Sequence, residues 1–306
     1  MTDQLARFFV RTEVAAPGLD LSIVVPAFNE AERLPVLLQS LRKHVDLDRT
    51  EVIVVDDGST DATAQVVAET KGFASLRVVS HDSNRGKGAA VRTGVQASRG
   101  PRIAFVDADD ATDLNVLGAM CDRLEGAVGA VFGSRHASGS VVMGSPPIRG
   151  LMGRVFNHVV RFAAGTSISD TQCGAKVFRA AVAKVVFADS EIDGFAFDVE
   201  ILRRLMALDV GVVEHPVRWR YVAGTKIRLL TPVRMLRDIT RLRLRGSELA
   251  LDRIACRFDP VLSDLADPLI DRAVRDGAPC ELLFDPIVHA RPELEEWLAA
   301  RELLTS

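Results

Sequence analysis

The stretch IAFVDADDATD, residues 103–113, begins as an apolar strand and ends in four carboxylates, those of Asp107, Asp109, Asp110 and Asp113. Carboxylates crowded on one loop repel one another, so either a cation binds there or some of them cap the next helix. Alternate side chains of a strand point to the same side, which allows Asp107 and Asp109 to present their oxygens together. These two acids suit Mg²⁺ or Mn²⁺, although helix capping is an equal alternative for them. For Asp110 and Asp113 we prefer helix capping.

Strands and helices alternate along the first part of the chain. Four short, β-branched segments bounded by turn residues predict buried strands: LSIVVP (21–26), EVIVV (51–55), SLRVVS (75–80) and RIAFV (102–106). Apolar residues at helical spacing predict helices over 32–45, 61–70 and 87–98. This alternation predicts an α/β fold with a mostly parallel, Rossmann-like sheet flanked by helices, and ligands beyond the carboxyl ends of its strands.

Two further loops of this part of the chain carry polar residues. VVDDGSTDAT (54–63) ends a strand with Gly58 in a tight turn and Asp61 placed to cap the next helix. Neither role explains Asp57, which could accept a hydrogen bond from a base N–H of a nucleotide. NRGKGAA (84–90) opens a helix and is a candidate cradle for a diphosphate, although it is neither a GxGxxG fingerprint nor a Walker A loop.

The second half of the chain is less regular. We expect an amphipathic helix over 148–162, a helix near 197–208 and a strand over 211–219. Residues 226–245 hold seven basic side chains and one acidic side chain among apolar residues, which suits a surface that lies on anionic lipid headgroups. A solvated helix packed on the core is the alternative. Nucleic-acid binding is disfavoured because no aromatic residues interleave with the charges.

The composition indicates a folded protein. With 306 residues and 48% hydrophobic content, the chain can bury a large core. No apolar run approaches about 18 residues, and charged residues interrupt the N-terminus, so we expect no transmembrane helix, no signal peptide and a cytoplasmic location. The four cysteines are far apart, which argues against a zinc site or a disulfide framework. The histidines lack metal-ligand spacing; His44, His81 and His289 are interpreted as surface residues, and His136 as adjacent to GSR (133–135).

Eight motifs together resemble those of a known family, the family 2 glycosyltransferases with the GT-A fold. The first five are VVPAFNE (24–30), VVDDGSTD (54–61), NRGKGAA (84–90), DAD (107–109) and GSR (133–135). DTQCGAK (170–176), FAFDVE (195–200) and GTK (224–226) narrow the resemblance to dolichyl-phosphate or polyprenyl-phosphate glucosyltransferases, with the mannosyltransferases as close relatives. The resemblance covers about residues 20–245. It divides the chain into an N-terminal extension (1–20), a GT-A domain (21–245) and an acidic C-terminal extension (246–306).

The resemblance implies roles for individual residues. The nucleoside of a nucleotide sugar is held by Pro26, Phe28, Glu30 and Asp57, with Lys87 nearby, and Ala108 contacts the nucleotide through its backbone. Asp107 and Asp109 bind the Mg²⁺ or Mn²⁺ on the diphosphate. The phosphate of a polyprenyl or dolichyl acceptor is received by Arg135, Arg149 and Arg154. Arg220 and Lys226 face the donor in the manner of the mannosyl relatives; the glucosyl relatives commonly lack that arginine, so the sugar stays open.

The expected reaction is an inverting transfer in which a phosphate oxygen attacks the anomeric carbon. A phosphate monoester, with a second pKa of about 6, is already largely anionic and hardly needs a general base. A hydroxyl acceptor would need one, and Asp198 and Glu200 are the candidates; their alternative role is to favour the dipole of a helix as acids in its first turn. With the metal ligand Asp109 they form the expected catalytic set.

The first hypothesis is therefore transfer from a nucleotide sugar, UDP-glucose before others, to polyprenyl phosphate by a protein peripheral on the cytoplasmic membrane face. The alternatives are a soluble glycosyltransferase with a hydroxyl acceptor and mannosyl transfer from GDP-mannose. A phosphoacceptor signalling domain also places paired acids after its first strand, but it is much shorter and leaves DTQCGAK and FAFDVE without a role. Residues 251–306 carry twelve acidic and six basic side chains, and this tail could pack on the domain, form a homo-oligomer contact or cover the basic surface.

Overall fold

The structure, a computed structural model, describes residues 16–144, 161, 165–188, 190–208, 210–222, 235 and 237–240. All of them belong to one compact unit, Glu13–Glu248. Arg149, Arg154 and Lys226 lie outside the described residues, as does the acidic extension 246–306. So do most of the basic segment 226–245 and all of the helix expected over 148–162 except residue 161.

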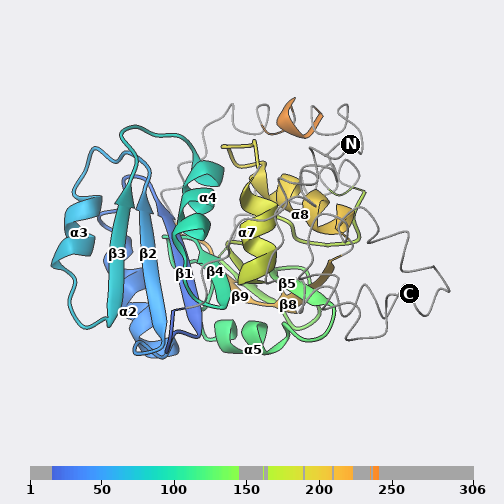
Figure 1. The fold of residues 1–306 in the computed structure, drawn as a ribbon, viewed down its shortest axis with the longest axis horizontal. Coiled ribbons are helices and arrows are strands. Elements are labelled where there is room, and N and C mark those ends of the chain that lie inside the picture. Colours follow the sequence, from blue (N-terminus) through green and yellow to red (C-terminus); the bar gives the residue numbers. More distant parts are fainter. Residues whose placement is uncertain are drawn as a thin grey trace, which may run out of the picture. The chain divides into compact units, whose positions relative to one another are not determined.

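A seven-stranded sheet in the order β3-β2-β1-β4-β7-β5-β8 forms the centre of this unit (Figure 1). Its strands are β1 Leu21–Ala27, β2 Thr50–Asp56, β3 Ser75–Ser80, β4 Arg102–Val106, β5 Val128–Ser134, β7 Ala175–Arg179 and β8 Gly211–Pro216. Neighbouring strands are parallel except for β7, which runs antiparallel to both β4 and β5. The predicted mostly parallel α/β sheet and the first four predicted strands are therefore confirmed.

Helices cover both faces of the sheet. They are α2 Leu34–His44, α3 Thr63–Glu69, α4 Lys87–Ala97, α5 Val116–Asp122, α7 Ala180–Ala188 and α8 Phe197–Ala207. One apolar core joins α2, α3 and α5 to one face of the sheet, where leucines at helical spacing in α2 meet the alternate valines of β2. On the other face α4 packs on β1 and β2 and contacts α7 (Figure 1). The helices predicted over 32–45, 61–70, 87–98 and 197–208 are confirmed.

The strand expected over 211–219 is two strands. β8 ends at Pro216, which has no backbone N–H to continue the ladder, and β9 (Arg218–Arg220) pairs instead with β6 (Val141–Met143) in a small parallel ribbon. The ribbon is tied to the loop after β4, because Asp113 N donates to Arg218 O at 2.9 Å. Helix α5 begins only at Val116.

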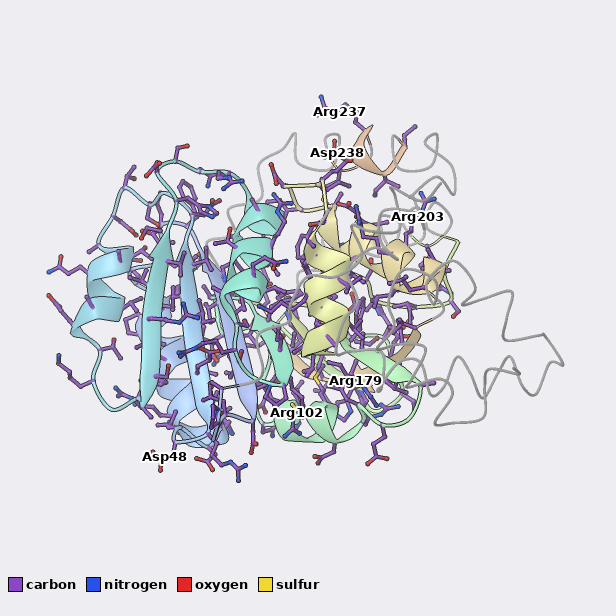
Figure 2. All side chains as sticks on the ribbon, in the orientation of Figure 1. Asp48, Arg102, Arg179, Arg203, Arg237 and Asp238 are labelled. Atoms are coloured by element: carbon purple, nitrogen blue, oxygen red, sulfur yellow. The ribbon has the colours of Figure 1, made fainter. Side chains whose placement is uncertain are left out.

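The two ends of the sheet differ: ion pairs and hydrogen bonds hold the amino end, and polar loops follow the carboxyl end. At the amino end of β4, Arg102 is the cross-strand partner of Arg179 on β7, and the two lie together in Figure 2. Arg179 donates to the carbonyl oxygens of Leu124, Gly126 and Val128, and so ties β7 to the turn before β5. The polar loops follow the opposite, carboxyl ends of β1, β2 and β4. Within the described residues, no helix has the length and apolarity to span a bilayer.

Candidate active site

Asp107 and Asp109 follow the carboxyl end of β4, as the sequence predicts. Asp107 Oδ1 lies 2.6 Å from Nζ of Lys87, at the start of α4, and Asp109 accepts a hydrogen bond from Ala111 N at 3.1 Å. Burial and the neighbouring Asp107 raise the pKa of Asp109. Burial lowers the pKa of Lys87, but the charges of Asp107 and Asp198 outweigh it and the net pKa is raised. The loop thus concentrates negative charge around one ammonium group.

The side chain of Asp107 fits because residue 174 is a glycine. A Cβ on Gly174 would lie 2.3 Å from Asp107 Oδ2, and Asp107 N donates to Gly174 O at 3.0 Å. The motif DTQCGAK therefore supplies the space that Asp107 occupies. No local pattern in the sequence gives Gly174 a role, because nothing near it in the chain indicates that β4 lies alongside.

The paired carboxylates fit a divalent cation shared with a diphosphate. Asp107 Oδ1 is paired with Lys87 Nζ at 2.6 Å, so a divalent cation on this carboxylate would share it with the ammonium group. The described residues contain no group of three or more His, Cys, Asp or Glu side chains able to hold a metal. A cation on these two acids would take its other ligands from phosphate oxygens and water, as Mg²⁺ commonly does.

A second, fully buried ion pair, between Lys176 and Asp198, interacts electrostatically with the pair of Lys87 and Asp107. Lys176 on β7 is 1% exposed, and its Nζ lies 2.8 Å from Asp198 Oδ1 and donates to Cys173 O at 2.8 Å. The ammonium also lies over the ring of Phe105, 4.8 Å from its centroid. Burial raises the pKa of Asp198, although Lys176 and Lys87 act in the opposite direction. Asp198 is therefore part of the charge network, and Lys176, which sequence analysis did not select, is its direct partner.

Comparison with known proteins shows the family of the chain. Residues 22–187 match the family model described as glycosyl transferase family 2. The chain belongs to glycosyltransferase family 2. It is 35% identical over 242 residues to a dolichyl-phosphate beta-glucosyltransferase of Dictyostelium discoideum, covering 74% of each chain. It is 33% identical over 248 residues to the protein of that name in Homo sapiens, covering 75% of this chain and 76% of the human protein.

Solved structures support the GT-A-like fold of this glycosyltransferase. Glucosyl-3-phosphoglycerate synthase from Mycobacterium tuberculosis, in complex with Mn²⁺, uridine diphosphate and glucosyl-3-phosphoglycerate, aligns with a TM-score of 0.55 at 19% identity. The alignment covers 79% of this chain and 82% of that one. The same synthase in complex with Mg²⁺ and uridine diphosphate gives the same TM-score.

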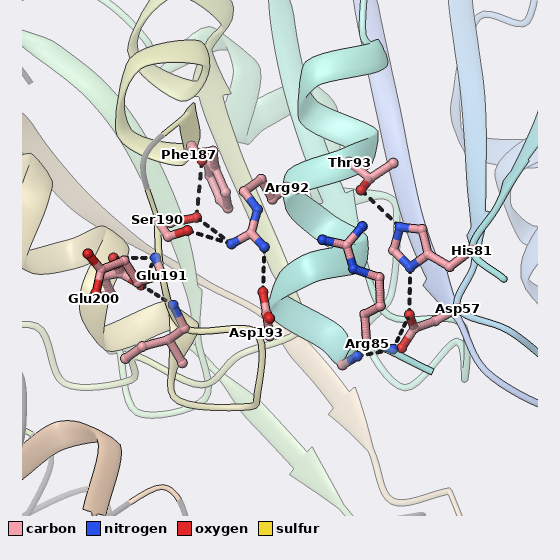
Figure 3. Close-up of polar contacts among 12 residues, drawn as sticks. Asp57, His81, Arg85, Arg92, Thr93, Phe187, Ser190, Glu191, Asp193 and Glu200 are labelled. Carbon is pink, nitrogen blue, oxygen red and sulfur yellow. Dashed lines mark hydrogen bonds and ion pairs between the residues drawn. The ribbon is translucent and has the colours of Figure 1, made fainter. Parts of the chain in front are cut away.

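Asp57 of the glycosyltransferase holds the loop that carries Lys87. Its carboxylate accepts hydrogen bonds from Arg85 N at 2.9 Å and Gly86 N at 2.8 Å, and lies 2.7 Å from His81 Nδ1 (Figure 3). His81 Nε2 lies 2.9 Å from Thr93 Oγ1 on α4. The interpretation of His81 as an ordinary surface residue is wrong, since its side chain is only 6% exposed. Asp57 already has three partners, which leaves its carboxylate little capacity for a nucleotide base.

The backbone of NRGKGAA does not form the predicted diphosphate cradle. Gly88 N and Ala89 N both donate to Asp193 O, at 2.7 and 3.3 Å. A Cβ on Gly88 would lie 2.3 Å from Ile192 O, so the glycine admits the loop 190–194 rather than a phosphate. Arg92 fastens the same loop through an ion pair with Asp193 (Figure 3). The side chain of Lys87, which points to Asp107, is not part of these backbone contacts.

Glu200 is a structural residue rather than a free base. It is 1% exposed and accepts hydrogen bonds from Glu191 N at 2.9 Å and Ile192 N at 2.8 Å (Figure 3). Arg204 Nη2 also donates to this carboxylate, at 2.8 Å. These bonds fix the start of the loop that packs on α4. We therefore leave Glu200 out of the proposed catalytic set, although the sequence suggested it.

Arg135 is bound within the protein. Its backbone N, Nε and Nη2 donate to the carboxylate of Asp170 at 2.9, 2.7 and 2.8 Å, and its guanidinium lies over the Trp219 ring. Burial lowers the pKa of Arg135, but the bonds and charge of Asp170 outweigh it and the net pKa is raised. An acceptor phosphate would have to share this guanidinium with Asp170.

Arg220 pairs with Asp110 and borders a cavity. Its Nη2 lies 2.6 Å from Asp110 Oδ2, and its backbone N donates to Ala111 O at 2.8 Å. The cavity, about 270 Å³, is also lined by Ser40, Met143 and Arg218. The preferred interpretation of Asp110 as a helix cap is wrong, because Asp110 has φ of 53° and lies well before α5. Asp113 accepts from Asn115 N at 3.2 Å, in a turn just before that helix.

The predicted nucleoside-binding residues Pro26, Phe28 and Glu30 lie at the carboxyl end of β1 and in the loop that follows it. Pro26, Phe28 and Glu30 are half-buried, and Glu30 forms an ion pair with Arg33 at 2.6 Å. Glu30 N donates to Thr63 Oγ1 at 2.8 Å, which joins this loop to the start of α3. Ala108, between the two metal-ligand candidates, is 5% exposed.

Proposed function

We propose that this glycosyltransferase moves glucose from UDP-glucose to the phosphate of a dolichyl or other polyprenyl phosphate, with Mg²⁺ or Mn²⁺ as cofactor. The observation that carries the proposal is the Asp107–Asp109 pair after the carboxyl end of β4, fixed beside the ammonium group of Lys87. The names of the relatives support the glucosyl donor and the lipid acceptor. We place the protein at the cytoplasmic face of a membrane, where such an acceptor is available.

The residues of the site suit departure of a nucleoside diphosphate. A cation on Asp107 and Asp109 would neutralise the charge that grows on the leaving diphosphate. The Lys87 ammonium, fixed beside the same carboxylates, adds a second positive charge there. A bond forms between the acceptor phosphate oxygen and the anomeric carbon, the bond from that carbon to the diphosphate breaks, and the configuration inverts.

The two candidate bases, Asp198 and Glu200, already have partners within the protein, which favours a phosphate acceptor over a hydroxyl acceptor. Glu200 accepts hydrogen bonds from two backbone amides and Arg204, and Asp198 is paired with the buried Lys176. A hydroxyl would need one of them as a proton acceptor. A phosphate monoester needs none at neutral pH, since its second pKa is about 6.

Arg220, the residue that resembles the mannosyl relatives, forms an ion pair within the protein. Arg220 would face the donor in a mannosyl-type site, but its guanidinium is paired with Asp110 at 2.6 Å. Its expected partner, Lys226, lies outside the described residues. We therefore keep glucose as the proposed sugar and GDP-mannose as the comparison in the test.

The test is product formation from labelled UDP-glucose or GDP-mannose with polyprenyl phosphate or with the same lipid as the free alcohol. We expect glucosyl transfer to the phosphate alone, and its loss with EDTA. Asp107→Asn and Asp109→Asn should each lower kcat by roughly 10²–10³-fold, whereas Asp122→Asn, an exposed change on α5, should leave it unchanged. Transfer to the alcohol, or full activity with EDTA, would overturn the acceptor or the metal assignment respectively.

A further inference from the structure

We infer that the β6–β9 ribbon is the surface by which this protein docks on an anionic lipid bilayer. The inference rests on the proposed lipid-phosphate acceptor, and it assigns a contact surface to residues outside the basic segment 226–245. It depends on three features of the ribbon: exposed apolar side chains, arginines in register with them, and hydrogen bonds to the loop after Asp109.

The apolar side chains of β6 are unusually exposed. Val141, Val142 and Met143 are 41, 47 and 49% exposed. Among the described residues only Val36 and Met206 are other large apolar side chains with such exposure, so three of the five are consecutive. A run of exposed apolar residues costs solubility unless it has a function. Consecutive residues of a strand point to opposite faces, so both faces of the ribbon edge are apolar.

The partner strand supplies positive charge and an aromatic residue. In the parallel register Val141 pairs with Arg218, Val142 with Trp219 and Met143 with Arg220. Arg218 is exposed and forms no salt bridge with another described residue, and the side chain of Arg220 is 53% exposed. Apolar side chains beside arginine and tryptophan suit the boundary of a bilayer, where acyl chains, phosphates and interfacial water lie within a few ångströms.

The ribbon is joined to the candidate active site by its backbone. Arg220 N donates to Ala111 O at 2.8 Å, Asp113 N donates to Arg218 O at 2.9 Å, and Thr112 forms a bridge with Trp219. The loop 110–113 directly follows Asp109. A ribbon seated on the headgroups therefore places this loop, with the cavity lined by Met143, Arg218 and Arg220, at the depth of lipid phosphates.

A second copy of the chain suits this surface less well than a bilayer. A stable protein interface needs about 800 Å² from each partner, far more than two three-residue strands offer. A two-fold contact would use the same patch of both copies and so would gather the arginines of both copies in one small interface. Lipid phosphates instead complement the charge of Arg218, which forms no salt bridge with another described residue.

The experiment is vesicle flotation of the full chain without donor or acceptor. The vesicles contain phosphatidylcholine alone or with phosphatidylglycerol. The triple variant Val141→Thr, Val142→Thr, Met143→Thr keeps the β-propensity of the strand and should lower the partition coefficient about tenfold on both vesicles. Arg218→Gln should lower it about fivefold, and only on anionic vesicles. A matched control, Val36→Thr with Met206→Gln, removes equally exposed side chains from α2 and α8 and should bind as the wild type.

Wild-type binding by the triple variant, or an equal loss in the matched control, overturns the inference. So does a wild-type dimer that the triple variant dissociates with vesicle binding unchanged, since the surface would then belong to a second copy. Arg218→Gln keeps the inference testable if the triple variant is shown by thermal melting to be unfolded. Because no sugar or lipid acceptor is present, failure here with intact glucosyl transfer overturns the surface and not the proposed reaction.

Discussion

At the scale of single residues, the position of Asp107 depends on the missing side chain of Gly174. The Cβ of Gly174→Ala would lie 2.3 Å from Asp107 Oδ2, so the carboxylate must move. Because displacement of a reacting group by about 1 Å can cost roughly 100-fold in rate, we expect a loss of kcat of at least about tenfold and a higher Mn²⁺ requirement in steady-state assays. Gly118→Ala is the control, since its Cβ meets nothing within 4 Å. Equal activities of the two variants would contradict this role of Gly174.

His81 shows how a buried polar residue can be mistaken for a surface one. We expect His81→Leu to destabilise the protein by roughly 1–3 kcal/mol, because Asp57 and Thr93 both lose a buried partner. The loop before Lys87 should also become less ordered and raise KM for the donor. Urea unfolding and donor kinetics check both effects against His44→Leu, a change at an exposed position. The same unfolding free energy in the two variants would argue against the network.

At the scale of elements, Glu51 connects β1, β2, β3 and the chain just after α4 at the amino end of the sheet. It is fully buried and accepts from Ser22 Oγ on β1 at 2.6 Å and from Arg99 N after α4 at 2.5 Å, and it lies 3.4 Å from Arg77 Nη2 on β3. Burial raises the pKa of Glu51, but these hydrogen bonds and Arg99 outweigh it, so the net pKa is lowered. This end of the sheet is remote from the acids after β4.

The lowered pKa predicts a pH-dependent stability. Ionised Glu51 should stabilise the fold above its unfolded pKa of about 4.3, and this contribution should be lost as pH falls through the lower folded pKa. Glu51→Gln should therefore cost about 1.5–3 kcal/mol near neutral pH, with the difference from wild type shrinking in acid. Urea unfolding of both proteins across pH 3–7 measures this, and a difference that stays constant over the range would rule it out. Glucosyl transfer near neutral pH should be unaffected.

β7 could not be predicted from the sequence, because its place in the sheet depends on contacts with distant strands. β7 is a five-residue strand that contains the buried Lys176, and its antiparallel position between β4 and β5 depends on pairing with strands far away in sequence. Apolar runs of this length suit either a strand or a helix. β1 to β4 and their helices were predictable because each carries its own periodicity and ends in a turn.

At the scale of the whole molecule, the proposed donor and metal should bind cooperatively to the folded chain. We expect UDP with Mn²⁺ to raise Tm more than the sum of their separate effects, since a cation on Asp107 and Asp109 would also hold the diphosphate. A ligand at 100 times its Kd adds about 2.7 kcal/mol to the unfolding free energy. Differential scanning fluorimetry should show the effect for UDP and a smaller one for GDP. Additive shifts, or the same shifts in Asp107→Asn, would contradict a shared site.

The sequence by itself determined the parallel sheet and the polar edge that carries Asp107, Asp109 and Lys87, because periodicity and strand-end acids are local properties of the chain. Only the tertiary structure decided which of the other polar residues already form hydrogen bonds or ion pairs within the protein. Glu200 holds a loop and Arg135 holds Asp170. A hydrogen bond forms with whichever donor the fold brings within about 3 Å, and that proximity is set by packing between distant segments.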